Sequence, residues 1–146
     1  MISCQFEDGN KASLRHCTVD TIVFNDDKTK ILLAKRAENM IDGGKWGLPG
    51  GYMERDETTA ETAKRETFEE TGYELTELVF IKFNDDPNRN GGDRQNVNFL
   101  YSAIATQQTG KPDEESSEIC WFNLDNLPDE SKIAFDHFAA VTHLLT

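Results

Sequence analysis

Residues 51–73 read GYMERDETTAETAKRETFEETGY. From Glu57 to Thr71 this stretch holds neither glycine nor proline, and residues that favour helices dominate it, so we predict a helix over 57–71. Ala60, Ala63 and Thr67 follow one another at helical spacing and form a thin apolar stripe suited to packing on a sheet. Gly72 follows directly and reads as the residue that ends the helix.

Three carboxylates share one side of this predicted helix. At about 100° per residue, Glu69 and Glu70 fall about 60° and 40° to either side of Glu66, within an arc of roughly 100°. Such like charges cost ~0.2–0.5 kcal/mol per pair even when exposed, and a cation would offset that cost. Hard oxygen ligands in this number suit Mg²⁺ or Mn²⁺. The alternative is a solvated acidic helix face, which is common in proteins.

Working outward, β-rich segments surround the helix. Residues 18–24 and 30–35 flank a turn and predict a hairpin. The glycine cluster of residues 43–51 predicts a loop. Further strands are expected at 78–83, 97–105 and 118–122, and a C-terminal helix over roughly 130–145, with Pro128 near its start. The mixture predicts an α/β (α+β) fold, and its length of 146 residues suits a single domain, residues 1–146.

Composition excludes several classes of function. The chain carries 27 acidic against 15 basic residues, a net charge of −12, which disfavours binding to a nucleic-acid polymer or an anionic membrane surface. No apolar run reaches the ~18 residues of a membrane span. Its three cysteines are widely spaced and form no metal or redox pair. We therefore expect a cytoplasmic location.

The acidic helix and its flanks resemble the signature of Nudix hydrolases, G-x5-E-x7-R-E-U-x-E-E-x-G-U, where U is a bulky aliphatic residue. Every glycine, glutamate and arginine of that signature stands at the required interval, from Gly51 through Glu57 and Arg65 to Gly72. The two departures are Thr67 and Tyr73 at U positions, and both side chains can pack.

The resemblance implies an α/β/α sandwich with a mixed sheet, and an enzyme that hydrolyses a nucleoside diphosphate linked to another group, X. Carried over by position, Glu66, Glu69 and Glu70 become ligands of Mg²⁺ or Mn²⁺, with Gly50 in the same metal set. Glu57 is expected to support the loop–helix geometry or an outer ion, and Arg65 to orient the carboxylates. Such an ion neutralises the diphosphate and lowers the pKa of a bound water.

The general base is left open by the resemblance, because Nudix enzymes take it from the helix or from a later loop. Glu115 and Glu118 are the loop candidates here, and Glu118 is included in the predicted catalytic set. The stretch Phe135-Asp136-His137 also invites a catalytic role for the histidine, although a helix-surface or packing role for His137 is the simpler interpretation.

Substrate preference depends on weaker cues. The loop around Pro87 and Arg89 looks like one found in Nudix ADP-ribose pyrophosphatases, with the proline 15 residues beyond Gly72. Arg89 can make a bidentate phosphate contact, and Arg36 and Arg94 are further candidates for phosphate or ribose. The expected partner is thus a small nucleotide, and a homodimer is possible.

Three functions follow from these observations. The first is hydrolysis of ADP-ribose, or a similar nucleoside diphosphate sugar, to a nucleoside monophosphate and phosphorylated X. The second is pyrophosphohydrolysis of oxidised nucleoside triphosphates such as 8-oxo-dGTP. The third is a ligand sensor without turnover, which retention of all the signature glutamates disfavours.

Overall fold

The computed structural model describes residues 2–89 and 94–145. Its strands and helices, in chain order, are β1 (Ile2–Gln5), β2 (Lys11–Leu14), β3 (Cys17–Phe24), β4 (Lys30–Arg36), β5 (Trp46–Gly47), β6 (Gly50–Tyr52), α1 (Thr59–Thr71), β7 (Tyr73–Asn84), β8 (Val97–Gln108), β9 (Ser116–Asn123), the 3₁₀ helix η2 (Glu130–Lys132) and α2 (His137–Leu145).

A seven-stranded mixed sheet forms the middle of the fold. Its main path runs β5-β4-β3-β8-β7, with β6 paired to β3 and β9 paired to β4. Strands β3 and β8 run parallel in register from Cys17 beside Val97 to Phe24 beside Ile104, and the other pairs are antiparallel. Strand β7 therefore lies at one edge of the sheet.

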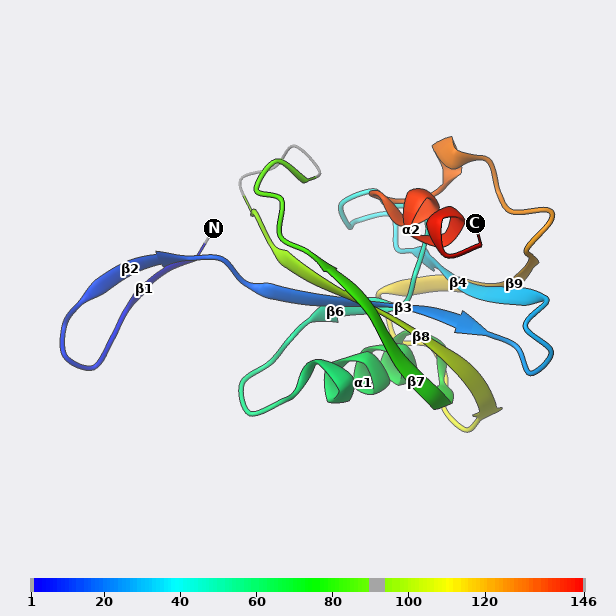
Figure 1. The fold of residues 1–146 in the computed structure, drawn as a ribbon, viewed down its shortest axis with the longest axis horizontal. Helices are drawn as coiled ribbons and strands as arrows, with labels where there is room; N and C mark the ends of the chain where they lie inside the picture. Colours follow the sequence, from blue (N-terminus) through cyan, green and yellow to red (C-terminus); the bar gives the residue numbers. More distant parts are fainter. Residues whose placement is uncertain (1, 90–93, 146) are drawn as a thin grey trace.

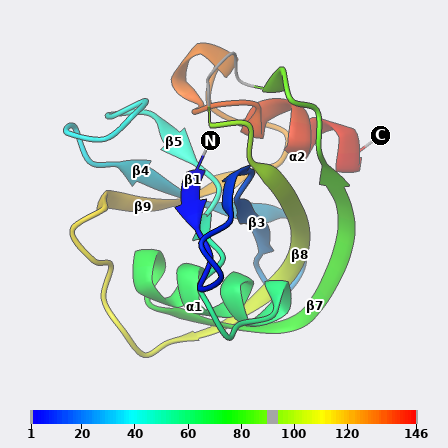
Figure 2. The ribbon, with the colours of Figure 1, turned by 90° about the vertical axis from the view of Figure 1, so that its left-hand side faces the viewer.

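The two helices cover opposite faces of this sheet (Figure 1). Val19 and Tyr101 pack with Ala63 of α1, while Ile22 and Leu100 pack with Val141 of α2, because successive residues of a strand face opposite sides. Figure 2 shows the same layers from the side, with the curved sheet between α1 and α2. The expected α/β/α sandwich with a mixed sheet is confirmed.

Helix α1 begins two residues later than predicted. Thr58 precedes it in an extended conformation and accepts from the Glu61 N–H, while the Glu61 carboxylate accepts from the Thr58 N–H. This capping box satisfies two backbone donors and places the start at Thr59. At the other end Gly72 adopts φ 74° and donates to Phe68, as its predicted role requires.

The predicted C-terminal helix over 130–145 is wrong in its first half. After η2 the backbone is extended at Ile133 and turns at residues 135–136, and α2 begins only at His137. Ala134 donates to the Trp46 carbonyl and Phe135, with φ 52°, donates to Asp42, so this segment bonds to the β4–β5 region instead of to itself. Tertiary hydrogen bonds override the local helix preference here.

Other expected bounds also change. The segment predicted as a glycine loop contains β5 and β6, and β7, β8 and β9 extend beyond the ranges predicted for them. The hairpin of β1 and β2 was not predicted and projects from the body of the molecule (Figure 1).

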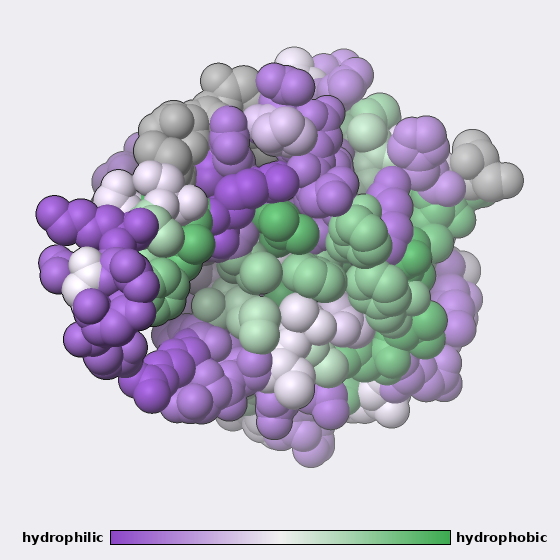
Figure 3. Space-filling model, turned by 60° about the vertical axis from the view of Figure 1, so that its left-hand side comes forward, coloured by the Kyte–Doolittle hydropathy of each residue, from purple (hydrophilic) through white to green (hydrophobic). Residues whose placement is uncertain are grey.

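The surface of the molecule is mixed in polarity. Figure 3 shows a face on which apolar side chains gather between hydrophilic ones. Among the exposed large apolar residues, Val79, Phe80 and Phe83 belong to β7. Within the described residues, no helix is long and apolar enough to cross a membrane.

Candidate active site

Helix α1 carries the three predicted carboxylates beside strand β6. The Glu70 side chain is buried, the Glu66 side chain is 13% exposed, and that of Glu69 is 47% exposed. The Glu70 Oε2 accepts a hydrogen bond from the Gly50 N–H at 3.1 Å. The helix thus presents one carboxylate to the interior, one at the boundary and one to solvent.

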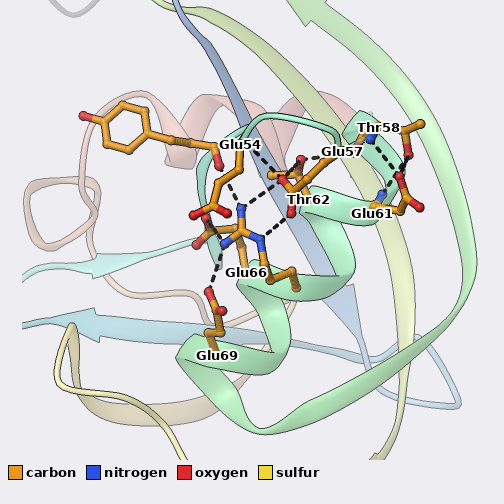
Figure 4. A network of polar contacts seen from close by, with 9 residues as sticks. Glu54, Glu57, Thr58, Glu61, Thr62, Glu66 and Glu69 are labelled. Carbon is orange, nitrogen blue, oxygen red and sulfur yellow. Dashed lines mark hydrogen bonds and ion pairs between the residues drawn. The ribbon is translucent and has the colours of Figure 1, made fainter.

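Arg65 lies at the centre of a polar network, because it donates to Glu57, Glu66 and Glu69. Figure 4 shows these three glutamates turned toward one another. Its Nη1 donates to Glu66 Oε1 at 2.7 Å and to Glu69 Oε2 at 2.9 Å. Its Nη2 donates to the Tyr52 carbonyl at 2.9 Å, which connects α1 to β6. Only a planar guanidinium offers donors in enough directions for this set of acceptors.

Glu57 completes the network from the turn before α1. Its carboxylate accepts from Arg65, from the Glu54 N–H at 3.0 Å and from the Thr62 hydroxyl at 2.7 Å. The Arg65 hydrogen bond is the main cause that lowers the pKa of Glu57 to about 2. Glu57 therefore stays ionised and joins the turn to the helix, consistent with the supporting role expected for it.

Burial acts in the opposite direction on Glu66 and Glu70. Burial raises the pKa of Glu66, although Arg65 opposes the shift. It raises the pKa of Glu70 well above its ordinary value, and the Gly50 hydrogen bond only partly opposes it. A buried carboxylate with so little compensation favours a cation that would share it.

The donor set fits a hard divalent cation in its chemistry, because all the side-chain donors are carboxylate oxygens. In residues 2–89 and 94–145, however, no three His, Cys, Asp or Glu side chains converge as ligands would. Arg65 instead engages Glu57, Glu66 and Glu69. These glutamate side chains would have to rotate to bind a cation together. The exposed Glu69 side chain has room for such a rotation. Gly50 directs its N–H at Glu70, and its place in the metal set stays a prediction.

The two loop candidates for the general base lie in different surroundings. The charge of Glu115 acts on Glu66, and the preceding Asp113 N–H donates to the Glu69 carbonyl at 2.9 Å, so this loop lies against α1. Glu118 is in β9 and pairs with Lys35 at 3.9 Å. Which of the two acts as the general base stays a prediction.

One of the predicted substrate residues, Arg36, lies near the carboxylates. The charge of Arg36 acts on Glu70, and its guanidinium lies 5.0 Å from the centre of the Phe135 ring. Arg94 Nη1 donates to the side-chain hydroxyl of Tyr52. The backbone carbonyl of the same residue accepts from Arg65.

Arg89 and Pro87 have other surroundings. Asp86 accepts from the Arg89 N–H at 3.1 Å across a turn, with Pro87 at its second position, where proline is favoured. The Arg89 side chain is only 7% exposed and pairs with Asp136 through two nitrogens at 2.7 and 2.8 Å. Their roles in substrate binding stay predictions.

Sequence reasoning missed a buried polar cluster on the α2 side. His137 Nδ1 accepts from the Leu48 N–H at 2.9 Å, so its proton is on Nε2, which lies 3.3 Å from Asp20 Oδ2. Asn98 donates to the same oxygen at 2.8 Å. One feature of the sequence could have indicated this cluster: Asp20 is a charged residue inside the apolar run TVDTIVF.

The fold and the carboxylate network define a class: a mixed-sheet sandwich with a glutamate-rich helix packed against a glycine-rich turn. Comparison with known proteins gives the family. Residues 14–144 match the family model of the NUDIX domain, and the chain belongs to this family. An ADP-ribose pyrophosphatase of Methanocaldococcus jannaschii is 36% identical over 120 residues, which are 82% of this chain and 66% of that protein.

Solved structures agree with this assignment. A bifunctional NMN adenylyltransferase/ADP ribose pyrophosphatase of Francisella tularensis, complexed with AMP and a Mn ion, superposes with a TM-score of 0.69 at 26% identity, over 90% of this chain and 41% of that one. The NUDIX domain of Shewanella oneidensis NrtR, complexed with ADP ribose, gives 0.69 at 26% identity over 92% and 91%. The chain therefore spans 66% and 41% of the two named pyrophosphatases.

Proposed function

We propose that this protein is a divalent-cation-dependent pyrophosphohydrolase that cleaves a nucleoside diphosphate linked to X, with ADP-ribose as the preferred substrate. The observation that carries the proposal is the complete carboxylate network of α1, in which Arg65 joins Glu57, Glu66 and Glu69 beside the buried Glu70. Similarity to an ADP-ribose pyrophosphatase over 82% of the chain supports the substrate class.

In this proposal Glu66, Glu69 and Glu70 hold Mg²⁺ or Mn²⁺. When bound, the ion neutralises the diphosphate and lowers the pKa of a coordinated water. Arg65 is a positioning residue that orients Glu66 and Glu69, and the Gly50 N–H orients Glu70. Arg36 supplies positive charge near Glu70, and Arg94 is a further predicted contact to the anionic substrate.

The expected reaction with ADP-ribose gives AMP and ribose 5-phosphate. A cytoplasmic location, a homodimer and the absence of nucleic-acid partners stay predictions that accompany this function. The Mn ion in the Francisella structure supports a divalent cation, and Mg²⁺ is the metal we expect from the oxygen ligands.

The test is product analysis with ADP-ribose, NADH, diadenosine polyphosphates, dGTP and 8-oxo-dGTP, each with Mg²⁺ and with Mn²⁺. We compare the wild type with Glu69→Gln and with the matched control Glu61→Gln, on the same helix. Glutamine can replace Glu61 in the capping box, so this control keeps the helix start.

We expect the wild type to convert ADP-ribose to AMP and ribose 5-phosphate. The rate of this conversion should be at least 100-fold lower in Glu69→Gln and unchanged in Glu61→Gln. If only the triphosphates react, with release of pyrophosphate, the protein is a nucleoside triphosphate pyrophosphohydrolase and ADP-ribose is not its substrate. Binding of ADP-ribose without any product would instead indicate a ligand sensor.

A further inference from the structure

One side chain of α2 holds the turn between β5 and β6, although α2 lies on the face of the sheet opposite α1 (Figure 1). His137, the first residue of α2, is buried, and its Nδ1 accepts from the Leu48 N–H at 2.9 Å. A Cβ added at Gly47 would lie 3.4 Å from the same Nδ1, so the imidazole ring lies against the turn. Helix α2 is therefore joined to the backbone of this turn by a hydrogen bond from a residue 89 positions away.

Asp20 determines which nitrogen of the ring faces the turn. A neutral imidazole has one donor and one acceptor, so the nitrogen that accepts from Leu48 leaves the proton on Nε2. Nε2 lies 3.3 Å from Asp20 Oδ2, and Asn98 donates to the same oxygen at 2.8 Å. A flipped ring would place an N–H against the Leu48 N–H. The buried carboxylate of Asp20 thus selects the orientation and tautomer in which His137 can accept from Leu48.

The turn held by His137 leads directly to a carboxylate of α1. Pro49, whose ring fixes its φ angle, joins Leu48 to Gly50. The Gly50 N–H then donates to Glu70 Oε2 at 3.1 Å. Only two peptide bonds therefore separate the backbone group that His137 holds from the backbone group that holds Glu70.

Glu70 depends on this one donor for its orientation. Its side chain is buried, and among the residues that the structure describes its carboxylate accepts the Gly50 hydrogen bond and no other. The direction of the Gly50 N–H therefore determines where the Glu70 oxygens lie.

Strand β3 holds the turn along one edge. The Thr21 N–H donates to the Pro49 carbonyl at 2.9 Å, and Asp20 pairs with Gly50 in the register of β3 and β6. Contacts along one edge leave the turn able to tilt about that edge, unless another contact holds its far side. The hydrogen bond from Leu48 to His137 supplies such a contact.

We propose that His137 is a positioning residue for Glu70: it holds Leu48 so that the Gly50 N–H points at the buried carboxylate. Asp20 keeps the ring in the tautomer that can do this. The expected effect on hydrolysis rests on the proposed function, whereas the expected effect on the Gly50 amide does not require turnover.

Two amide substitutions separate the two contacts of the ring. In His137→Asn, the side-chain oxygen lies near the position of Nδ1 and can accept from Leu48, but the side chain is too short to reach Asp20. In His137→Gln, the amide nitrogen lies near the position of Nε2 and can donate to Asp20, but Leu48 loses its acceptor. Val141→Ala, which shortens a buried side chain of the same helix, is the control for loss of stability alone.

Two measurements are made on each variant. The first is the chemical shift of the Gly50 amide in ¹⁵N-labelled protein with EDTA, and the second is kcat and KM for ADP-ribose at saturating Mg²⁺. We expect the Gly50 amide to shift in His137→Gln and to stay near its wild-type position in His137→Asn and Val141→Ala. Groups that orient metal ligands typically contribute 10–100-fold, so kcat should fall at least tenfold in His137→Gln, and less than about threefold in the other two variants. KM should change less than about twofold in all three variants.

Equal kcat values in His137→Asn and His137→Gln, or an equal loss in Val141→Ala, would overturn the proposal. If the wild type hydrolyses no substrate, it is the proposed function that fails, and the Gly50 amide then decides the role of His137. A shift of that amide in His137→Gln that is absent in His137→Asn would support positioning, and an unchanged amide in His137→Gln would exclude it.

Discussion

Gly51 of β6 lies directly against the carboxylate of Glu66 on α1. A Cβ added at Gly51 would lie 2.5 Å from Glu66 Cδ and Oε2, and 2.6 Å from Oε1. No other residue type fits while that carboxylate keeps its place. The glycine therefore determines how closely the helix carboxylates approach the turn.

Replacing Gly51 with alanine should reduce activity more than stability. The group in the way is the end of a flexible side chain, so Glu66 can rotate aside at a cost below about 1 kcal/mol. Displacing a reactive-site group by about 1 Å can lower the rate ~100-fold. We expect kcat for ADP-ribose to fall between about 10- and 100-fold, measured by AMP release.

Gly50→Ala is the informative comparison. Its Cβ would lie 2.1 Å from the Val19 carbonyl, which is backbone and cannot rotate away. We expect the free energy of unfolding to fall by about 1–3 kcal/mol, measured in urea. Equal losses of stability in the two variants would contradict the distinction.

Arg65→Lys should lower kcat without a large change in KM. Lysine keeps the charge but cannot donate to Glu57, Glu66 and Glu69 from one planar group. Loss of a group that orients metal ligands typically costs 10–100-fold in activity or metal affinity. Steady-state kinetics checks this, with Arg55→Lys, whose side chain is 94% exposed, as the control. Activity at the wild-type level in Arg65→Lys would exclude a positioning role.

Divalent cations should stabilise the wild type through Glu70. At a free cation concentration of 100 times the dissociation constant, binding adds about 2.7 kcal/mol to the free energy of unfolding. Glu70→Gln should lose most of this gain, yet be more stable than the wild type without metal at pH 7, because it removes a buried charge. Thermal unfolding with EDTA and with Mg²⁺ measures both effects. An undiminished metal effect in Glu70→Gln would remove this residue from the ligand set.

The helix and its site were predictable from the sequence because their determinants are local. The spacing of residues along α1 predicts that its carboxylates share one side and that the helix ends at Gly72. Arg65 also contacts Glu66 and Glu69 within the same helix. The two unusual signature residues also pack as expected: Thr67 is fully buried, and the Tyr73 ring contacts Trp121 edge-on at 5.7 Å.

What could not be predicted depends on contacts between distant segments. The break before α2 arises because Phe135 bonds to Asp42, 93 positions away. The Arg89 side chain pairs with Asp136, 47 residues further along the chain, and nothing in the loop around Arg89 indicates this partner. Alternation within β3 places Asp20 inside the fold, yet no pattern in the sequence indicates that His137 lies beside it.

The pair of Arg89 and Asp136 should make stability depend on acidic pH. Burial alone would raise the pKa of Asp136, but the hydrogen bonds and charge of Arg89 outweigh it and hold that pKa below its ordinary value. A lowered pKa in the folded state contributes stability above the unfolded pKa of about 3.9, and this is lost as pH falls through the folded value.

Asp136→Asn should therefore lower the free energy of unfolding at pH 7, by about 1–3 kcal/mol, since it leaves Arg89 buried without its partner. It should also weaken the further loss of stability below about pH 4. Urea unfolding at pH 7 and pH 3.5 measures both, with the exposed Asp26→Asn as control. Identical pH dependence in the wild type and Asp136→Asn would contradict this account.

Replacing the two loop glutamates separately should distinguish their roles in catalysis. Glu115 acts electrostatically on Glu66 from a loop that lies against α1, whereas Glu118 pairs with Lys35 in the sheet and its side chain is 56% exposed. A general base contributes about 100- to 10,000-fold. We expect Glu115→Gln to lower kcat by at least 100-fold and Glu118→Gln to change it less than twofold. The dependence of kcat on pH should lose its acidic limb only in Glu115→Gln, because a base must be deprotonated to act. If both variants keep full turnover, the base must lie among the carboxylates of α1 itself.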